Sequence, residues 1–300
     1  MALDLRPLTL AELLDRSFST YKRHLWLFVG IMAVPAIVAT LYAVAIQAFN
    51  TTMTPDMTPE QALFRVIPLM IGVFVFLIVL MVVHTFALGA TTIAVGQLHQ
   101  GLQPSVAESY REARRHGGRL MLLIIWASLR LAGAWFGLMI LTILLSLVVA
   151  LASRIASGVF VFIGLIGGFL FTGYLAIRYG VSVPALVLEE VSAGKALARS
   201  VELTAGNRGR VFLIMLCAAM INYATAALLQ GPFMLGALIA GPGTAAAIGL
   251  TIVGAVLGGI GSMFSGPIMI IGLAMIYYDL RVRKEALDLR MMLDSLDAPK

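Results

Sequence analysis

Charged residues are scarce in this sequence of 300 residues. Lys, Arg, Asp and Glu together make up 12% of it, whereas 60% of it is hydrophobic, and soluble domains carry about twice that share of charge. A soluble fold would have to bury far more apolar surface than a chain of this length can enclose, and a lipid bilayer removes that requirement. The composition therefore indicates an integral membrane protein.

Cysteine and metal-binding patterns are scarce as well. Cys217 is the single cysteine, so an intrachain disulfide is excluded, and a structural metal site needs several ligands. The sequence contains no His/Cys cluster with metal-ligand spacing, no GxSxG and no GxxxxGK[ST]. We therefore expect no metal, no cofactor and no catalytic residues, and we interpret the protein as non-enzymatic.

The start of the chain has no long apolar run. Residues 1–24 carry seven charged residues, which argues against a cleavable signal peptide. Beyond them, six stretches reach the roughly 20 apolar residues of a spanning helix. The pattern predicts an all-α integral membrane fold with six transmembrane helices, at 25–49, 63–98, 120–152, 159–188, 211–240 and 246–280.

Basic residues lie unevenly about these predicted spans. One side receives 17 of them and the other only Arg65 and Arg154, so the positive-inside rule predicts that both termini are cytoplasmic. Positive charge beside spans favours anionic membrane lipids as partners and argues against nucleic acid. The residues expected at lipid headgroups are Arg16, Lys22, Arg23, Arg114, Arg115, Arg119, Arg208, Arg210, Arg281, Arg283 and Lys284.

Three segments on the basic side resemble one another. They begin at Thr9, Ser105 and Ser192, and each precedes two predicted spans. The spacing predicts one membrane domain over 1–300, built from three two-span repeats at about 8–103, 104–191 and 192–280, with a cytoplasmic tail at 281–300.

Each of these segments has the pattern of a short amphipathic helix. Thr9 with Glu12, and Ser105 with Glu108, predict capping boxes. The third segment keeps Ser192 but has Lys195 where the acid should be, so it predicts only a partial cap. Apolar residues at helical spacing with charges opposite them favour helices that lie in the headgroup layer. The alternative is that the segments are connectors held by the span ends.

Two arginines, Arg130 and Arg178, fall inside predicted spans. In continuous helices each would lie about 16 Å from its basic or acidic neighbour at the cytoplasmic edge, near the middle of the bilayer. A charge there should face protein, water or an anion. They could bind an anionic group such as a lipid phosphate, or instead snorkel to the surface or bind backbone carbonyls.

Acidic residues are absent from the middle of the predicted spans, which argues against a proton relay. Glu189 and Glu190 mark the cytoplasmic exit of the fourth span, where we expect them to neutralise Lys195 or Arg178.

Glycine and proline punctuate the later spans. The small-residue pairs Gly164/Gly168 and Gly254/Gly258 favour close packing inside the protein over homodimerisation. Prolines within spans predict kinks, and they are Pro35, Pro184, Pro232 and Pro267.

Three segments resemble the bacterial membrane domain attached to some glycerophosphodiester phosphodiesterases. They read LAELLDRSFSTYKRH from Leu10, VPALVLEEVSAGKALARSVELTAGNRGRVF from Val183, and YYDLRVRKEALDL from Tyr277. The resemblance implies a stand-alone polytopic domain in the bacterial cytoplasmic (inner) membrane. The resemblance does not imply the phosphodiesterase activity. The enzyme's His-Arg-Gly element is not present, because this sequence reads His116-Gly117-Gly118 and so lacks the Arg. In addition, no segment outside the spans has the roughly 250 residues of a catalytic barrel.

Two functions stay open. The first is a non-enzymatic membrane scaffold or accessory domain that interacts with anionic lipids or with a membrane or cytoplasmic protein partner. The second is a transporter or lipid-translocating protein with an anionic-group site at Arg130 and Arg178.

Overall fold

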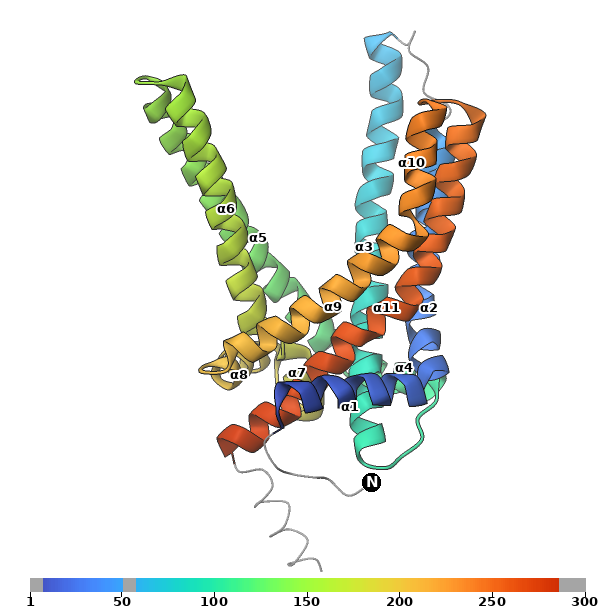
Figure 1. The fold of residues 1–300 in the computed structure, drawn as a ribbon, viewed down its shortest axis with the longest axis vertical. Coiled ribbons are helices and arrows are strands. Elements are labelled where there is room, and N and C mark those ends of the chain that lie inside the picture. The colour runs from blue at the N-terminus through green and yellow to red at the C-terminus, as the bar shows by residue number, and fades with distance from the viewer. Residues whose placement is uncertain (1–7, 51–57, 286–300) are drawn as a thin grey trace, which may run out of the picture. The chain divides into compact units, whose positions relative to one another are not determined.

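The computed structural model describes residues 8–50 and 58–285, and every regular element within them is an α-helix (Figure 1). The predicted all-α fold is therefore confirmed, while residues 286–300 of the predicted tail lie outside this part of the chain. The helices are α1 (Leu10–Arg23), α2 (Leu25–Asn50), α3 (Pro59–His99), α4 (Val106–Arg115), α5 (Gly117–Ala150), α6 (Arg154–Tyr179), α7 (Ser182–Leu188), α8 (Ala193–Thr204), α9 (Arg208–Leu229), α10 (Gly231–Ala240) and α11 (Ala245–Glu285).

Within residues 8–50 and 58–285, six segments are long and apolar enough to cross a membrane, which agrees with the predicted number of spans. They are Leu25–Phe49, Phe64–His99, Gly117–Ala150, Arg154–Leu188, Arg208–Leu229 and Ala245–Glu285. A short helix precedes two spans three times along the chain, at α1, α4 and α8. This order of helices agrees with the predicted arrangement of three units. That the three units are copies of one repeat stays a prediction.

Two of the predicted spans are interrupted, which corrects the expectation of continuous helices. Gly180 and Val181 separate α6 from α7, and Gln230 separates α9 from α10. Pro184 and Pro232 then lie in the first turn of the new helix, where a missing backbone N–H costs no hydrogen bond. The other two prolines, Pro35 and Pro267, lie inside α2 and α11.

The chain divides into two compact units, and α9 and α11 each contribute to both. The first unit comprises Leu8–Gly117 and Leu213–Met275, and so holds α1 to α4, α10 and most of α9 and α11. The second comprises Gly118–Phe212 and the described residues 276–285, and so holds α5 to α8 with the first residues of α9 and the last of α11.

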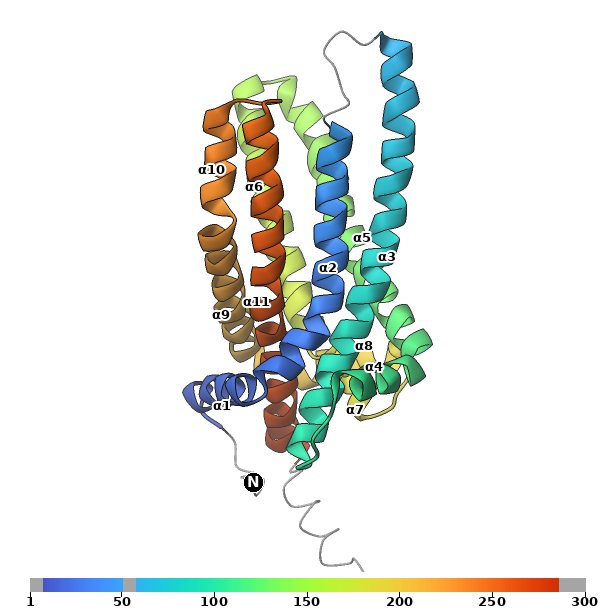
Figure 2. The same ribbon diagram turned by 90° about the vertical axis from the view of Figure 1, so that its right-hand side faces the viewer.

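In the first unit, α1 and α4 run crosswise to α2 and α3 at one end of them (Figures 1 and 2). Both predicted capping boxes are present. The Thr9 hydroxyl accepts from the Glu12 backbone N–H at 3.3 Å, and the Ser105 hydroxyl accepts from that of Glu108 at 3.2 Å. At α8, Ser192 forms no side-chain cap, so the partial cap predicted there is absent.

Tyrosine hydroxyls fasten these crosswise helices to the spans. Tyr21 of α1 donates to the Phe264 carbonyl oxygen of α11 at 2.7 Å. Tyr110 of α4 donates to the Ile31 carbonyl oxygen of α2, also at 2.7 Å, and burial raises the pKa of Tyr110 to about 12. Each crosswise helix is therefore held by a specific hydrogen bond as well as by its buried apolar side chains.

Glycines of α11 let neighbouring helices approach within the first unit. A Cβ at Gly259 would overlap the Thr40 side chain of α2, and a Cβ at Gly258 would lie 3.1 Å from Oε1 of Gln230, at the break between α9 and α10. A Cβ at Gly254 would lie 3.1 Å from Cβ of Phe233. The predicted internal use of these glycines is confirmed.

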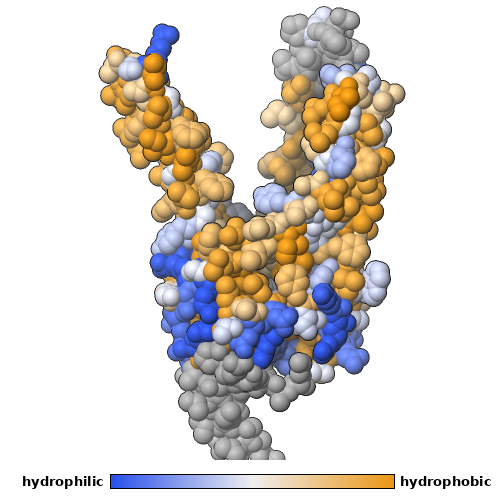
Figure 3. Space-filling model, in the orientation of Figure 1, coloured by the Kyte–Doolittle hydropathy of each residue, from blue (hydrophilic) through white to orange (hydrophobic). Residues whose placement is uncertain are grey.

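The second unit combines an apolar hairpin with a polar base. In the hairpin, Gly164 and Gly168 of α6 face the Thr142 and Met139 side chains of α5. Most of the hairpin surface is hydrophobic, while hydrophilic residues gather around α8 at its base (Figure 3). Leu120, Leu186 and Leu197 are fully buried there, so the base is a packed structure that can position polar side chains.

Helix α4 is expected to lose stability as the pH falls. Hydrogen bonds from the backbone N–H and hydroxyl of Ser105, aided by the charge of Arg111, hold the pKa of Glu108 below its usual value. A carboxyl with a lowered folded-state pKa stabilises the fold above its unfolded pKa, and that contribution is lost as the pH falls through the folded pKa. We expect hydrogen exchange in Val106–Arg115, corrected for intrinsic rates, to become faster over this range. Glu108→Gln still caps the helix and should remove the pH dependence; an unchanged pH profile in that variant would contradict the assignment.

Candidate anionic-group site

Many of the basic residues predicted at lipid headgroups have partners within the protein. The long-range and local partners are Glu112 for Arg115, the Glu190 carbonyl oxygen for Arg119, Asp279 for Arg210 and Arg283, Glu285 for Arg281, and the Glu202 carbonyl oxygen for Lys284. Lys22, Arg23 and Arg114 are exposed, and Arg16 is half-buried. A count of basic residues along the chain therefore overstates the charge left for lipid.

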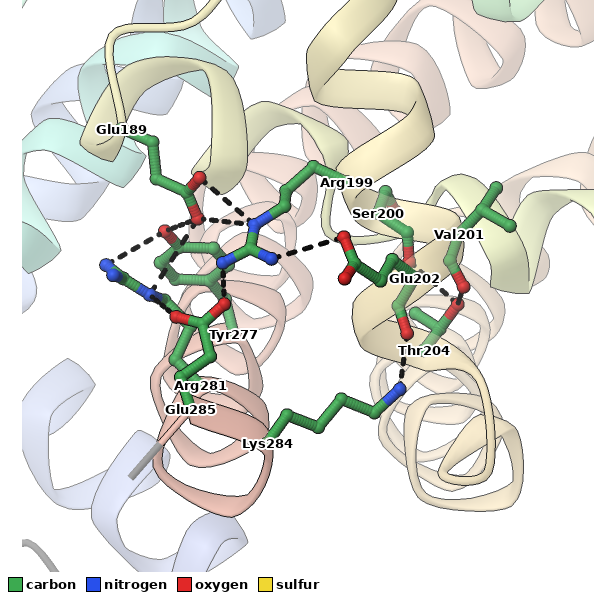
Figure 4. A network of polar contacts seen from close by, with 10 residues as sticks. All are labelled: Glu189, Arg199, Ser200, Val201, Glu202, Thr204, Tyr277, Arg281, Lys284 and Glu285. Carbon is green, nitrogen blue, oxygen red and sulfur yellow. Dashed lines mark hydrogen bonds and ion pairs between the residues drawn. The ribbon is translucent and has the colours of Figure 1, made fainter. Parts of the chain in front are cut away.

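A network of carboxylates and guanidinium groups ties α7, α8 and α11 together in the second unit (Figure 4). Glu189, which follows α7, accepts from Nε of Arg199 at 3.1 Å and from the Tyr277 hydroxyl at 2.7 Å. Glu285 pairs with Arg199 and accepts from Nε of Arg281 at 3.0 Å. The expectation that Glu189 neutralises Lys195 or Arg178 is wrong, because Glu189 binds Arg199 and lies 3.8 Å from Nε of Arg281.

The network leaves Arg199 firmly protonated. Its burial alone would lower the pKa of the guanidinium, but the hydrogen bonds and charges of Glu189 and Glu202 outweigh that effect and raise the pKa above its usual value. Lys284 adds a hydrogen bond to the Glu202 carbonyl oxygen at the end of the same helix (Figure 4). These residues hold the base of the unit together, and their charged groups pair with one another.

Asp279 is the most deeply buried carboxylate of this region, at 4% exposure. Its Oδ2 accepts from Arg210 of α9 at 3.0 Å and from Arg283, one turn further along α11, at 2.9 Å. A buried carboxylate is stable only when it is paired and hydrogen-bonded. The two arginines meet this condition and join the start of α9 to the end of α11.

Three other arginines of the second unit gather around aromatic rings, and we call them with these rings the arginine–aromatic cluster. Cζ of Arg178 lies 5.7 Å from the centre of the Tyr174 ring, and Cζ of Arg208 lies 5.1 Å from the same centre. The cluster is completed by Arg130, whose Cζ lies 5.9 Å from the rings of Trp126 and Tyr179.

Local structure places the two arginines at Tyr174. Arg178 follows Tyr174 by four residues on α6 and so lies on the same face of that helix. The Ser200 hydroxyl of α8 donates to the Arg178 carbonyl oxygen at 2.7 Å, which anchors the end of α6 to the base of the unit. Arg208 is the first residue of α9, where the positive end of a helix favours an anion.

Arg178 and Arg208 have spare hydrogen-bonding capacity. The Nε atom of each is buried and has no hydrogen-bond partner among the described residues, and neither side chain forms an ion pair with any of them. A buried donor without a partner costs about 1–3 kcal/mol. Two such donors at one ring make a place where the oxygens of an anion would be stabilised.

The depth predicted for Arg178 needs correction. That prediction assumed one helix from Arg178 to Glu189, but α6 ends at Tyr179, one residue after Arg178. Arg178 therefore lies in the last turn of its helix, beside the packed base. Arg130 does lie within continuous α5, is exposed, and contacts Tyr179 rather than the Tyr174 ring that Arg178 and Arg208 share.

Sequence reasoning missed the pairing of Arg178 with Arg208. Both arginines were predicted as site residues, but Arg208 was assigned only to the headgroup surface. Arg208 is far from Tyr174 in the sequence, so no local pattern predicts that the two side chains are in contact. Tyr174 itself carried no signal beyond its place near a span end. No group of three or more His, Cys, Asp and Glu that could hold a metal ion occurs among the residues whose placement is described.

Residues 151–295 match the family model described as the membrane domain of glycerophosphoryl diester phosphodiesterase. The match confirms the resemblance noted for the segments from Val183 and from Tyr277, and the segment from Leu10 lies outside it. No curated protein and no solved structure matches the chain. This match and the six apolar helices among the described residues together support a multi-pass membrane protein.

The matched part of this membrane domain contains Arg178, Arg208 and Tyr174, as well as Glu189 and Asp279. The family is defined by the membrane domain and not by the catalytic one, which is compatible with a non-enzymatic protein. The groups that could bind a ligand in the second unit are thus the arginines and aromatic rings described above.

Proposed function

We propose that this protein is a non-enzymatic scaffold or accessory domain of the membrane that holds anionic lipid headgroups at Arg178 and Arg208. The observation that carries the proposal is that both guanidinium groups lie at the Tyr174 ring with a buried, unpartnered Nε. The neighbouring arginines Arg199 and Arg210 already have carboxylate partners. Arg178 and Arg208 can therefore bind an external anion at the Tyr174 ring.

A phosphate group fits this arrangement chemically. Arginine binds phosphate oxygens through two parallel N–H groups, and such charge-assisted hydrogen bonds are about twice as strong as neutral ones. The guanidinium group is attracted to the tyrosine ring through its flat face. The N–H groups at its edge therefore stay available for hydrogen bonds to an anion. Tyr174, Tyr179 and Trp126 are also of the residue types that favour the membrane–water interface, which is where lipid phosphates lie.

The proposal includes the setting of the site. The membrane is the bacterial cytoplasmic membrane, the basic side faces the cytoplasm, and α1, α4 and α8 lie in the inner headgroup layer. The large excess of basic residues on one side of the spans supports this orientation. A membrane or cytoplasmic protein would then be held at the same surface.

The test compares two double variants with equal charge. Arg178→Gln/Arg208→Gln removes the proposed site, and Arg154→Gln/Lys195→Gln removes two charges at exposed positions of the same unit. Native mass spectrometry of protein incubated with phosphatidylglycerol and phosphatidylcholine measures the retained lipid. We expect the first variant to lose its preference for the anionic lipid by about tenfold or more and the control to keep it. Equal retention in both variants would overturn the proposal.

Transport of an anionic lipid is a second candidate, favoured by the two interrupted spans. Helix breaks at a binding site are a feature of many transporters, and the break after α6 directly follows Arg178 and Tyr179. Transfer of a labelled anionic lipid between the leaflets of proteoliposomes, lost in Arg178→Gln/Arg208→Gln, would establish transport. Retention of the lipid without transfer would leave the scaffold function.

A further inference from the structure

In the first compact unit, α4 lies across the ends of α2 and α3 (Figure 2). Side chains of these three helices line a groove. Its volume is about 240 Å³, and its lining residues are Val34 of α2, Val82, Val83 and Phe86 of α3, and Tyr110 and Arg114 of α4. None of these residues belongs to the arginine–aromatic cluster, which lies in the other unit.

Close contacts on both sides hold the walls of the groove in place. A Cβ at Gly30 of α2 would lie 2.9 Å from Cγ2 of Val106 at the start of α4, and a Cβ at Gly117 would lie 3.0 Å from Cε1 of Phe86. Between these points the Tyr110 hydroxyl donates to the Ile31 carbonyl oxygen at 2.7 Å. The groove is therefore a consequence of how α4 is fastened.

The groove surface itself is apolar, and Arg114 lines it through the carbon atoms of its side chain. Arg114 is exposed and has no hydrogen bond or ion pair with any residue that the structure describes. Its neighbour Arg115, by contrast, pairs with Glu112 at 2.8 Å. The Tyr110 phenol stays neutral, because burial raises its pKa to about 12. Arg114 is thus the single charge among the lining residues.

The apolar end of the groove continues into the exposed surface of the spans. Val34 on its rim is 43% exposed, and Ile78 and Val79, one turn before the lining residues of α3, are 44% and 43% exposed. Exposed apolar side chains on a spanning helix are covered by lipid chains in a bilayer. An amphiphile could therefore pass along this surface into the groove, with its charged end at Arg114.

We propose that this groove binds one phospholipid with an anionic headgroup. An acyl chain packs against Val82, Val83 and Phe86, and the phosphate pairs with Arg114. The lining residues of α3 span about one turn, from Val82 to Phe86, whereas a partner helix needs apolar anchors over two or more turns. The combination of an apolar trough and a lone cation matches both halves of a phospholipid. The inference is independent of the site at Arg178 and Arg208.

The experiment uses the full-length protein in mild detergent with phosphatidylglycerol, phosphatidylcholine or inorganic phosphate, and counts bound lipid by native mass spectrometry. Arg114→Gln removes the proposed headgroup contact, and Val83→Trp fills the groove. Arg115→Gln is the matched control, because it removes the same charge from the next position of α4. If Val83→Trp has a lowered melting temperature, Val34→Trp at the exposed rim replaces it.

We expect Arg114→Gln to weaken retention of one phosphatidylglycerol by about tenfold, Val83→Trp to remove that lipid, and Arg115→Gln to resemble the wild type. Inorganic phosphate should not displace the lipid, because it cannot fill the apolar part. The proposal is overturned if Arg115→Gln loses as much lipid as Arg114→Gln, if Val83→Trp keeps the lipid, or if free phosphate displaces it. Loss of this lipid in Arg178→Gln/Arg208→Gln would also overturn its independence from the other site.

Discussion

Replacing Asp279 by alanine is expected to lower the free energy of unfolding by about 3–5 kcal/mol, since removing one partner of a buried ion pair leaves an uncompensated charge. The Asp279 side chain is fully buried and pairs with both Arg210 and Arg283. Its loss would leave two partly buried guanidinium groups without their carboxylate. Reversible unfolding in mixed micelles, followed by circular dichroism, measures the difference from the wild type.

Glu202→Ala is the matched control for this substitution. Glu202 also pairs with an arginine of the second unit, Arg199, but its side chain is 68% exposed. Exposed ion pairs contribute only about 0–1 kcal/mol. If Asp279→Ala destabilises the protein no more than Glu202→Ala does, the pairing of Asp279 is not a main source of stability.

The features that were predictable from the sequence are those coded by neighbouring residues. Apolar runs located the six spans, since a span is defined by its own composition. The capping boxes at Thr9 and Ser105 were predictable because cap and partner are three residues apart. At α8 the same reasoning predicted a partial cap by Ser192, and the side-chain cap is absent. Each of these depends on contacts within one helix.

The pairings between helices were not predictable in the same way. Arg210 and Asp279 are separated by 69 residues, and Glu189 and Tyr277 by 88. Nothing in the local pattern distinguishes Arg210, which is paired, from Arg208, which is not. The rule that basic residues gather on one side of the membrane assigns Arg208 and Arg210 to the same side, and it gives no information about their partners.

The break after α6 had the largest consequence for the candidate site. Val183 and Pro184 continue an apolar run, so hydropathy alone extended the fourth span to Leu188 and put Arg178 well inside it. The helix ends at Tyr179 because the next residues, Gly180 and Val181, turn the chain into the packed base. The arginine that was expected deep in a span is therefore placed beside Arg208.

Glu189→Ala is expected to lower the free energy of unfolding by roughly 3 kcal/mol, because Glu189 accepts hydrogen bonds from both Arg199 and Tyr277 and hydrogen bonds to charged groups contribute about 1.5–3 kcal/mol each. Glu189→Gln keeps an acceptor oxygen and should lose less.

The effect of Glu189→Ala should also be local. These bonds tie α7, α8 and α11 together (Figure 4), so hydrogen exchange should become faster in α8 and at the end of α11 and stay unchanged in α1 and α4. Glu190→Asn is the control. Glu190 is exposed and has a φ of 54°, a conformation that asparagine tolerates, and its contact with Arg119 is made through the backbone. Equal destabilisation by Glu190→Asn, or faster exchange throughout both units, would show that the Glu189 network is not what holds the base together.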